Sequence, residues 1–356
     1  MKKLTHILVF SAVLLAFTLP RTPSSGATSA SPHQTNNLRL SSPSHPEQLT
    51  AAETIDDWMI ECVDCPKLIE FMGDHFMQLD SDGHPHVAYG GDHLYYAWYD
   101  GAEWHYKTVD GSPNVGQSAS LVLDNNGYPH ISYLDTQNNN LLYAFQDENG
   151  WHTQTADSGG DIGWHTSITV DGNGYPHIAY KNEDIDYASD LKYAYLDSLG
   201  WHASVIDKDA GGTQSLVLDA SGFPHISYFD RETDHLMYIY QDATGWYTET
   251  VESEAFPSQD ISMVMDAEGK PHVAYCLAYG TELKYAVRDT GGWHNQTTGN
   301  GICNSISLAL DQENNPHISI YDGINRQMIY TSRDAAGWHN QIVVADVLEG
   351  FIDSTS

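Results

Sequence analysis

One motif, repeated six times, limits the possible folds of this chain more than any other feature of its sequence. The dipeptide Pro-His recurs at intervals of 44 to 48 residues, with an Asp six residues before each His. A Tyr stands three residues after the His in five of the six copies. The six histidines are His86, His130, His177, His225, His272 and His317. A period of this length is typical of propellers and other repeat architectures.

The second half of each copy is equally regular. It ends in a Trp that is followed by His in five copies, at Trp104, Trp151, Trp201, Trp246, Trp293 and Trp338. In the second copy, Asp124-Asn-Asn-Gly127 and Asp147-Glu-Asn-Gly150 predict tight turns, because Asp accepts backbone hydrogen bonds and Gly takes positive φ. Alternating segments flank these turns, at 120–124, 129–133, 141–145 and 151–156.

Four short strands per copy, repeated radially, predict an all-β fold. We expect a six-bladed β-propeller whose blades are four-stranded antiparallel sheets. No segment has helical periodicity over three turns. Alternating residues of each copy should pack between neighbouring sheets, in the second copy Leu121, Leu123, Ile131, Tyr133 and Leu142.

An additional strand precedes the first complete copy. The segment Trp58–Asp64 aligns with Trp104–Asp110, and Phe351–Asp353 faintly resembles the start of another first strand. An open blade would expose unpaired strand edges, which favours a closed six-bladed ring with one spare strand. The alternative is an incomplete seven-bladed propeller.

The N-terminal segment predicts export. Lys2 and Lys3 precede an apolar run from Ile7 to Leu19, so residues 1–30 are interpreted as a secretory signal peptide. The run is too short to span a membrane, and we expect no membrane insertion. Residues 31–56 are predicted to be a flexible Ser/Pro-rich leader, 57–346 the propeller and 347–356 a C-terminal tail. The expected location is secreted, either extracellular or periplasmic.

The charge of the chain restricts its partners. The sequence has 48 acidic and 15 basic residues, with a formal net charge of −33. Nucleic acids and anionic membrane surfaces are therefore poor partners. The expected partner is an extracellular glycan or protein.

The Asp-x-x-Gly-Trp turns of the repeat are similar to degenerate Asp boxes. Over Trp58 to Asp346 the sequence resembles bacterial exported propellers, which include sialidase-type Asp-box propellers, lectins and scaffold proteins. The resemblance implies the fold. It does not imply an activity, because such turns lie away from the catalytic face in that superfamily and occur in proteins of different functions.

Candidate binding residues lie where the repeat is irregular. In a four-stranded meander, the loops between strands two and three share one face with the links between blades, and loops from several blades can form one site there. Aromatic rings and carboxylates suit sugar rings, or Ca²⁺. The alternative is a set of solvated Asp-rich loops. The predicted ligand-binding residues are Tyr133, Asp135, His165, Tyr228, Asp230, Arg231 and Asp322.

The repeated histidines do not predict a metal site. One His at the same place in every blade lies on a ring too wide for a single ion, and a residue found in every copy is expected to serve the packing of the repeat. The Trp that opens each outer strand should likewise cover the gap between blades. We therefore predict no metal site, no catalytic residue and no cofactor, with Ca²⁺ left open.

Two functions of different classes fit the sequence. The first is a non-enzymatic, lectin-like module that binds carbohydrate or protein. The second is a glycoside hydrolase of a neutral polysaccharide that uses a pair of loop carboxylates. An exo-sialidase is disfavoured because that family holds the substrate carboxylate with three arginines, and only Arg231 and Arg326 lie on the expected binding face.

Two cysteines interrupt the repeat at neighbouring points. Cys276 follows Tyr275 at the end of a second strand, and Cys303 precedes the first strand of the next copy. An exported chain favours disulfides, so we predict a Cys276–Cys303 bond, the alternative being two buried thiols. Cys62 and Cys65 would form a local pair.

Overall fold

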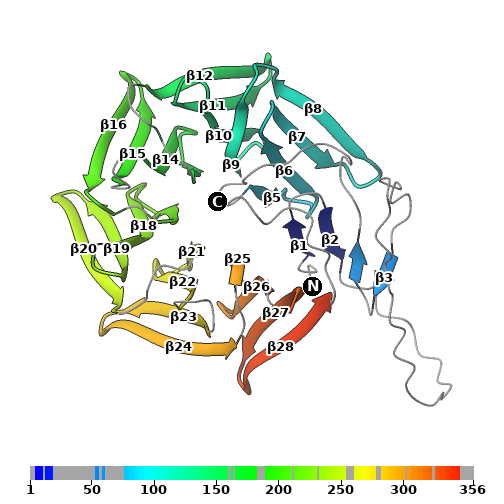
Figure 1. Ribbon diagram of the computed structural model, residues 1–356, viewed down its shortest axis with the longest axis vertical. Helices are drawn as coiled ribbons and strands as arrows, with labels where there is room; N and C mark the ends of the chain where they lie inside the picture. Colours follow the sequence, from blue (N-terminus) through cyan, green and yellow to red (C-terminus); the bar gives the residue numbers. More distant parts are fainter. Residues whose placement is uncertain are drawn as a thin grey trace.

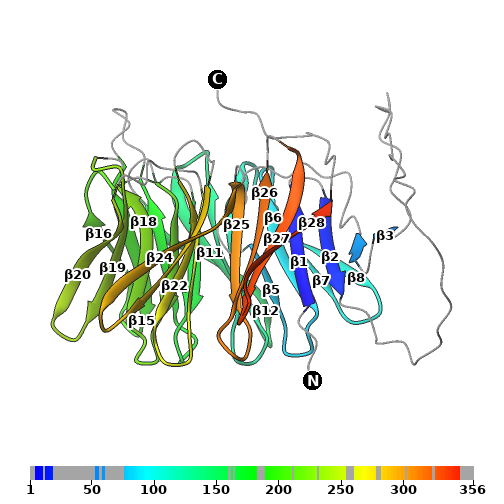
Figure 2. The same cartoon turned by 90° about the horizontal axis from the view of Figure 1, so that it is seen from below.

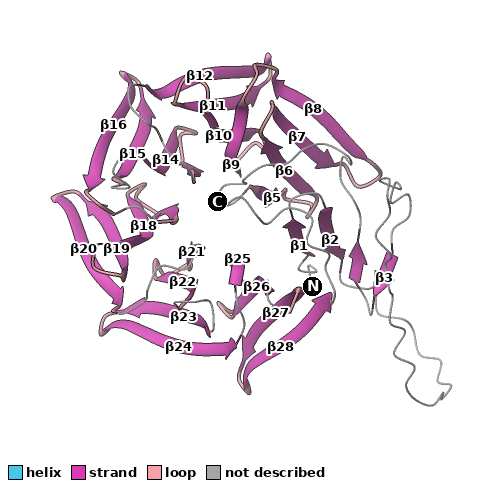
Figure 3. Cartoon of the chain, in the orientation of Figure 1, coloured by secondary structure: helices cyan, strands magenta, loops and turns pink. Residues whose placement is uncertain are grey.

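The fold is all-β, as predicted. The computed structural model describes residues 5–10, 13–18, 53–55, 58–60, 76–158, 162, 165–182, 189–210, 212–230, 232–253, 260–277, 282–300, 303–322 and 325–344. None of these residues is helical (Figure 3). Six four-stranded antiparallel sheets are arranged around a common axis (Figure 1), which confirms the six blades of the propeller.

Each blade uses four consecutive strands as a meander. Blade 1 contains β5 Met77–Leu79, β6 Pro85–Gly90, β7 Leu94–Tyr99 and β8 Trp104–Asp110. Blade 2 contains β9 Val115–Leu123, β10 Pro129–Asp135, β11 Asn140–Asp147 and β12 Gly150–Ser158. Blade 3 contains β13 Ser167–Val170, β14 Pro176–Lys181, β15 Leu191–Asp197 and β16 Gly200–Asp207.

The other three blades follow the same order. Blade 4 contains β17 Gln214–Leu218, β18 Pro224–Asp230, β19 His235–Asp242 and β20 Gly245–Glu252. Blade 5 contains β21 Ile261–Met265, β22 Pro271–Cys276, β23 Glu282–Asp289 and β24 Gly292–Asn300. Blade 6 contains β25 Cys303–Leu310, β26 Pro316–Asp322, β27 Gln327–Asp334 and β28 Gly337–Val344.

The predicted turn chemistry closes the hairpin between strands one and two. In blade 2, Asp124 Oδ1 accepts hydrogen bonds from the backbone N–H of Asn126 and of Tyr128, both at 2.8 Å. Gly127 has φ +81°, which a side chain would disfavour. Blade 6 places Asn314 at the same position with φ +61°, a conformation that Asn tolerates.

The predicted core is confirmed between the sheets. Ile131 pairs with Leu121 across β9 and β10, and Tyr133 pairs with Leu142 across β10 and β11. Leu121, Ile131 and Tyr133 are fully buried, while Leu123 and Leu142 pack partly buried against the same cluster. Residues of blade 1 join this cluster, so the core lies at the boundary between blades.

The described blades leave one interval in the ring. Inner strands contact their successors from β5 to β9 and onward to β25, but among the described strands no comparable contact leads from β25 to β5. Two two-stranded sheets lie in this interval (Figure 1), formed by β1 Thr5–Phe10 with β2 Val13–Thr18 and by β3 Glu53–Ile55 with β4 Trp58–Ile60. The ring thus consists of six complete blades and one interval, between blades 6 and 1, that holds fewer paired strands.

The two faces of the ring differ. Viewed edge-on, the tight hairpins between strands three and four gather at one face (Figure 2). The loops between strands two and three lie at the opposite face, which we call the loop face. Within the described part of the chain, no helix is long and apolar enough to span a membrane. The predicted C-terminal tail lies outside the described residues, as does the predicted leader apart from β3. The signal peptide stays a prediction.

Candidate functional site

The six Pro-His histidines serve the blades themselves. In every blade the His Nδ1 contacts the hydroxyl of a strand-three tyrosine, in the pairs His86–Tyr96, His130–Tyr143, His177–Tyr193, His225–Tyr238, His272–Tyr285 and His317–Tyr330. Burial lowers the pKa of His177 to about 4, so its ring is neutral at neutral pH and can accept the Tyr193 hydroxyl hydrogen. These histidines therefore connect strands two and three.

The repeated tryptophans join neighbouring blades, as the sequence predicts. Five of the six, those of blades 2 to 6, pack edge-on against the strand-three tyrosine of the preceding blade, with ring centroids 5.1 to 5.5 Å apart. The pairs are Tyr96–Trp151, Tyr143–Trp201, Tyr193–Trp246, Tyr238–Trp293 and Tyr285–Trp338. Such edge-to-face contacts are a favourable geometry for aromatic rings.

Two of the predicted ligand-binding residues also join blades. Tyr133 and Tyr228 are fully buried. The Tyr133 hydroxyl donates to Asp110 at 2.9 Å, and the Tyr228 hydroxyl donates to Asp207, in each case on the outer strand of the preceding blade. Burial raises the pKa of both tyrosines. Their rings face the neighbouring sheet instead of solvent.

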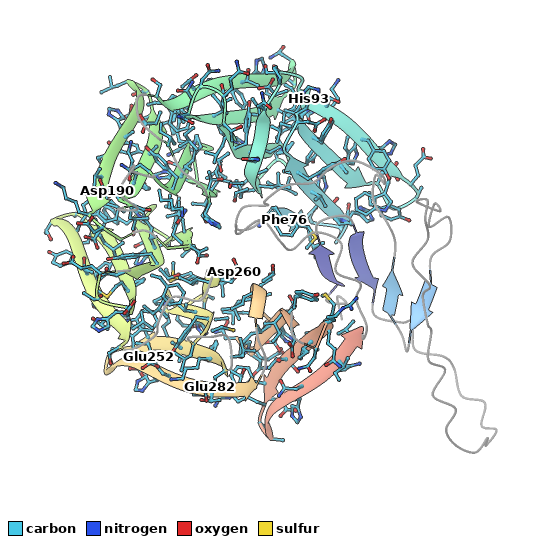
Figure 4. All side chains as sticks on the ribbon, in the orientation of Figure 1. Phe76, His93, Asp190, Glu252, Asp260 and Glu282 are labelled. Atoms are coloured by element: carbon cyan, nitrogen blue, oxygen red, sulfur yellow. The ribbon has the colours of Figure 1, made fainter. Side chains whose placement is uncertain are left out.

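The same contact recurs at two more boundaries. Tyr180 donates to Asp157 at 2.5 Å, and Tyr275 donates to Glu252 at 3.2 Å. Figure 4 labels Glu252 at the boundary between blades 4 and 5. We call these four hydrogen bonds the Tyr–acid tethers. Sequence reasoning missed them, although the acid stands six residues after the Trp of each of these outer strands.

The three predicted aspartates hold their own loops. Asp135 accepts hydrogen bonds from the N–H of Gln137 at 3.1 Å and of Asn138 at 3.0 Å. Asp230 accepts from the N–H of Glu232 at 2.9 Å, and Asp322 accepts from the N–H of Asn325 at 3.0 Å. Each carboxylate also accepts a side-chain donor of the same loop at 2.7 Å.

The three loops have the same design. They span 135–140, 230–235 and 322–327, and the residue four positions after the Asp has positive φ in each, at Asn139 (52°), Asp234 (56°) and Arg326 (55°). They follow β10, β18 and β26, which belong to alternate blades (Figure 1). We call them the alternate-blade loops. That their aspartates come from alternate copies of the repeat was visible in the sequence.

The exposed side chains of these loops differ from blade to blade. Thr136, Gln137 and Asn138 are exposed in the first loop, whereas Glu232 and Thr233 are exposed in the second. Each predicted aspartate thus orders a different set of hydroxyl, amide and carboxylate groups at the loop face. Each of the three carboxylates accepts hydrogen bonds from its own loop.

The remaining predicted residues, His165, Arg231 and Cys276, lie in different surroundings. His165 has φ +63°, its N–H donates to Ser118 Oγ at 3.1 Å, and its carbonyl accepts from the Gln214 side chain. It therefore links blades 2, 3 and 4. Arg231 lies outside the described residues. Cys276 is fully buried and disulfide-bonded, but its partner is not among the described side chains.

One group of potential metal ligands occurs among the described residues. Asp80, Asp82 and His84 place ligand atoms within 4.8 Å of one another. Asp80 Oδ1 already accepts the backbone N–H of Asp82 and of His84, so the carboxylate closes its own turn. This turn joins strands one and two and lies opposite the loops for which Ca²⁺ was considered.

Solved structures of lectins share this architecture. No family model matches the sequence, and no curated protein matches it. The SapL1 lectin in complex with α-methyl fucoside is 14% identical with a TM-score of 0.54, covering 78% of this chain and 98% of the lectin. This chain has the propeller fold of these lectins. The fucose-specific lectin from Aleuria aurantia is 12% identical with a TM-score of 0.53, covering 80% of this chain and all of the lectin.

Similarity at this level of identity establishes the fold alone. It confirms the propeller fold that the repeat indicates.

Proposed function

We propose that the protein is a secreted, non-enzymatic propeller that binds carbohydrate through the alternate-blade loops. The observation that carries this proposal is that an aspartate accepts backbone hydrogen bonds in each of three loops, and the residue four positions later has positive φ, while the exposed side chains differ. Ordered polar groups lose little conformational entropy when a ligand binds. Hydroxyl, amide and carboxylate groups are suitable hydrogen-bond partners for sugar hydroxyls.

The lectin structures support the same proposal. Their names state that they bind fucose or a fucoside, and the similarity extends over nearly the whole of each lectin. In this chain the loops lie on separate blades, so several sites of similar design would be carried by one ring. Such multivalency strengthens binding to a ligand that displays several sugars.

A glycan array probed with the purified protein tests this function, with one arm in Ca²⁺ and one in chelator. We expect binding to one class of glycan. Gln137→Ala and Glu232→Ala should each weaken it several-fold, because each removes one hydrogen-bonding group. Glu148→Ala is the matched control, since Glu148 is exposed on the hairpin face of blade 2.

Two outcomes would contradict the proposal. The first is binding to no glycan, which would favour a protein ligand. The second is release of reducing sugar from neutral oligosaccharides that stops in Asp230→Ala, which would establish a hydrolase. We expect no such release, because Asp230 accepts three hydrogen bonds within its own loop.

A further inference from the structure

The link between blades 1 and 2 joins loops of both blades at the loop face. Asn114 of this link has φ +60°. Its N–H donates to the carbonyl oxygen of Asp92 in blade 1 at 3.0 Å. Its own carbonyl oxygen accepts both the N–H and the hydroxyl of Thr136 in blade 2, each at 3.0 Å. The first alternate-blade loop is therefore connected through this link to the loop of blade 1.

Glycines allow the two blades to approach closely at this link. A Cβ atom at Gly116 would lie 2.5 Å from the carbonyl oxygen of His93, and one at Gly90 would lie 2.2 Å from the same oxygen. A side chain at either position would push the loop of blade 1 away from β9. Hydrogen bonds and close backbone contacts thus hold the loops of both blades in one arrangement. We call their outer side the blade 1–2 surface, formed by His93, Asn114, Thr136 and Gln137.

Two side chains of the blade 1–2 surface have a defined orientation. Asn114 Nδ2 donates to Gln137 Oε1 at 3.3 Å, which leaves the two N–H groups of Gln137 Nε2 for other acceptors. His93 Nδ1 lies 2.8 Å from the carbonyl oxygen of Ser112. Because a carbonyl oxygen only accepts, Nδ1 carries the hydrogen, and Nε2 of the neutral ring is an acceptor. The surface therefore offers a donor from blade 2 and an acceptor from blade 1.

Blades 3 and 4 have an equivalent link with different chemistry. Asp209 stands ten residues before its turn aspartate, as Asn114 does, and has φ +55°. Its N–H donates to the carboxylate of Asp190 in blade 3 at 3.2 Å. Figure 4 labels Asp190 and its counterpart His93. An ionised carboxylate only accepts hydrogen bonds, so the side chains at the three equivalent positions of blades 3 and 4 provide no donor. The equivalent residues are His93 and Asp190, Asn114 and Asp209, and Gln137 and Glu232.

We propose that the blade 1–2 surface binds two neighbouring hydroxyl groups of a neutral sugar, with Gln137 Nε2 donating to one and His93 Nε2 accepting from the other. The inference rests on the proposed function and deepens it, because it extends the site from the loop of blade 2 to a residue of blade 1. A sugar hydroxyl both donates and accepts, so a surface with both kinds of partner fits it. The surface of blades 3 and 4 provides side-chain acceptors alone and therefore has a different specificity.

Calorimetric titration of the full protein with a panel of neutral oligosaccharides tests the role of His93. His93→Asn keeps an N–H that can reach the Ser112 carbonyl but lacks Nε2, whereas His93→Gln places an acceptor near the position of Nε2. We expect His93→Asn to weaken binding about tenfold and His93→Gln to weaken it no more than about twofold. His294→Asn is the matched control, because His294 is exposed at the start of β24, away from the loop face. The opposite order of the two His93 variants, or unchanged binding in His93→Asn, would overturn the proposal.

Hydrogen exchange of the unmodified protein locates the same surface without any substitution. We expect the bound oligosaccharide to slow exchange of the backbone amides in 92–93, 111–114 and 136–138 together. Slower exchange in 136–138 alone would place the ligand on blade 2 and overturn the proposal. Binding of no oligosaccharide would overturn the proposed function as well, whereas binding that His93→Asn leaves unchanged overturns this inference alone, so the two failures are distinguishable.

Discussion

At the scale of single residues, Asp157 holds two donors at one boundary. It accepts the hydroxyl of Tyr180 at 2.5 Å and pairs with the ammonium group of Lys192. We expect Asp157→Ala to lower the free energy of unfolding by about 3 kcal/mol, because it leaves a poorly solvated cation without a partner. Tyr180→Phe removes one hydrogen bond and should cost about 1 kcal/mol. Urea denaturation measures both, and equal losses would contradict the role of Lys192.

The buried histidines give the protein a predictable response to acid. Burial lowers the pKa of His177 from 6.5 to about 4, and burial also lowers the pKa of His86, His130, His225 and His272. Below pH 6.5 the unfolded chain gains protons that the folded chain does not bind, so stability falls as the pH decreases. Below about pH 4 the contribution of His177 no longer changes.

His177→Gln tests this dependence. The shift for His177 corresponds to about 3 kcal/mol between pH 7 and pH 4. Gln keeps a group that can accept the Tyr193 hydroxyl but does not titrate. Urea denaturation at intervals from pH 7 to pH 4 should show a shallower loss of stability in the variant. An unchanged slope would show that His177 is protonated in the folded state.

At the scale of strands, the boundary between blades 5 and 6 has lost its Tyr–acid tether but contains a cysteine. Cys276 ends β22 and packs in one cluster with Ile306 of β25, the strand that begins at Cys303. We predict that Cys276 pairs with Cys303, which would close a loop of about 27 residues and contribute about 3 kcal/mol. Mass spectrometry of unreduced peptides identifies the pair. A Cys276–Cys62 peptide, or free thiols at both positions, would contradict it.

Strands and turns were predictable because their signals are local. The alternation of Leu121, Ile131 and Tyr133 and the Asp124 turn lie within a few residues of one another, and all are confirmed. The surroundings of Tyr133 and Tyr228 were not predicted. Their hydroxyls are bound by acids of the preceding blade, and a tyrosine at the end of a strand looks the same whether it faces a ligand or another sheet.

The candidate site was predicted only in part for a related reason. Asp135, Asp230 and Asp322 were recognised as special in the sequence. Whether such a carboxylate contacts a ligand or caps its own loop depends on backbone conformation, which residue identity does not specify. Here the loop backbone directs the N–H groups of Asn138 and Thr233 to the aspartates.

At the scale of the whole molecule, the number of copies predicts the number of complete blades but not the width of the ring. The angle between neighbouring sheets depends on how their side chains pack at each boundary. That packing is made by residues far apart in the sequence. The interval between β25 and β5 was therefore not predictable from the repeat. Its signals were the alignment of Trp58–Asp64 with Trp104–Asp110 and the faint resemblance of Phe351–Asp353 to the start of a first strand.

The contacts between blades also have a direction. In the hydrogen bonds of Ser120 with Ile168 and of Ser167 with Leu216, and in the Tyr–acid tethers, the earlier blade provides the accepting oxygen and the later blade provides the N–H or O–H. A blade that leaves the ribosome would therefore find its acceptors already folded, so the ring can grow in the order of synthesis.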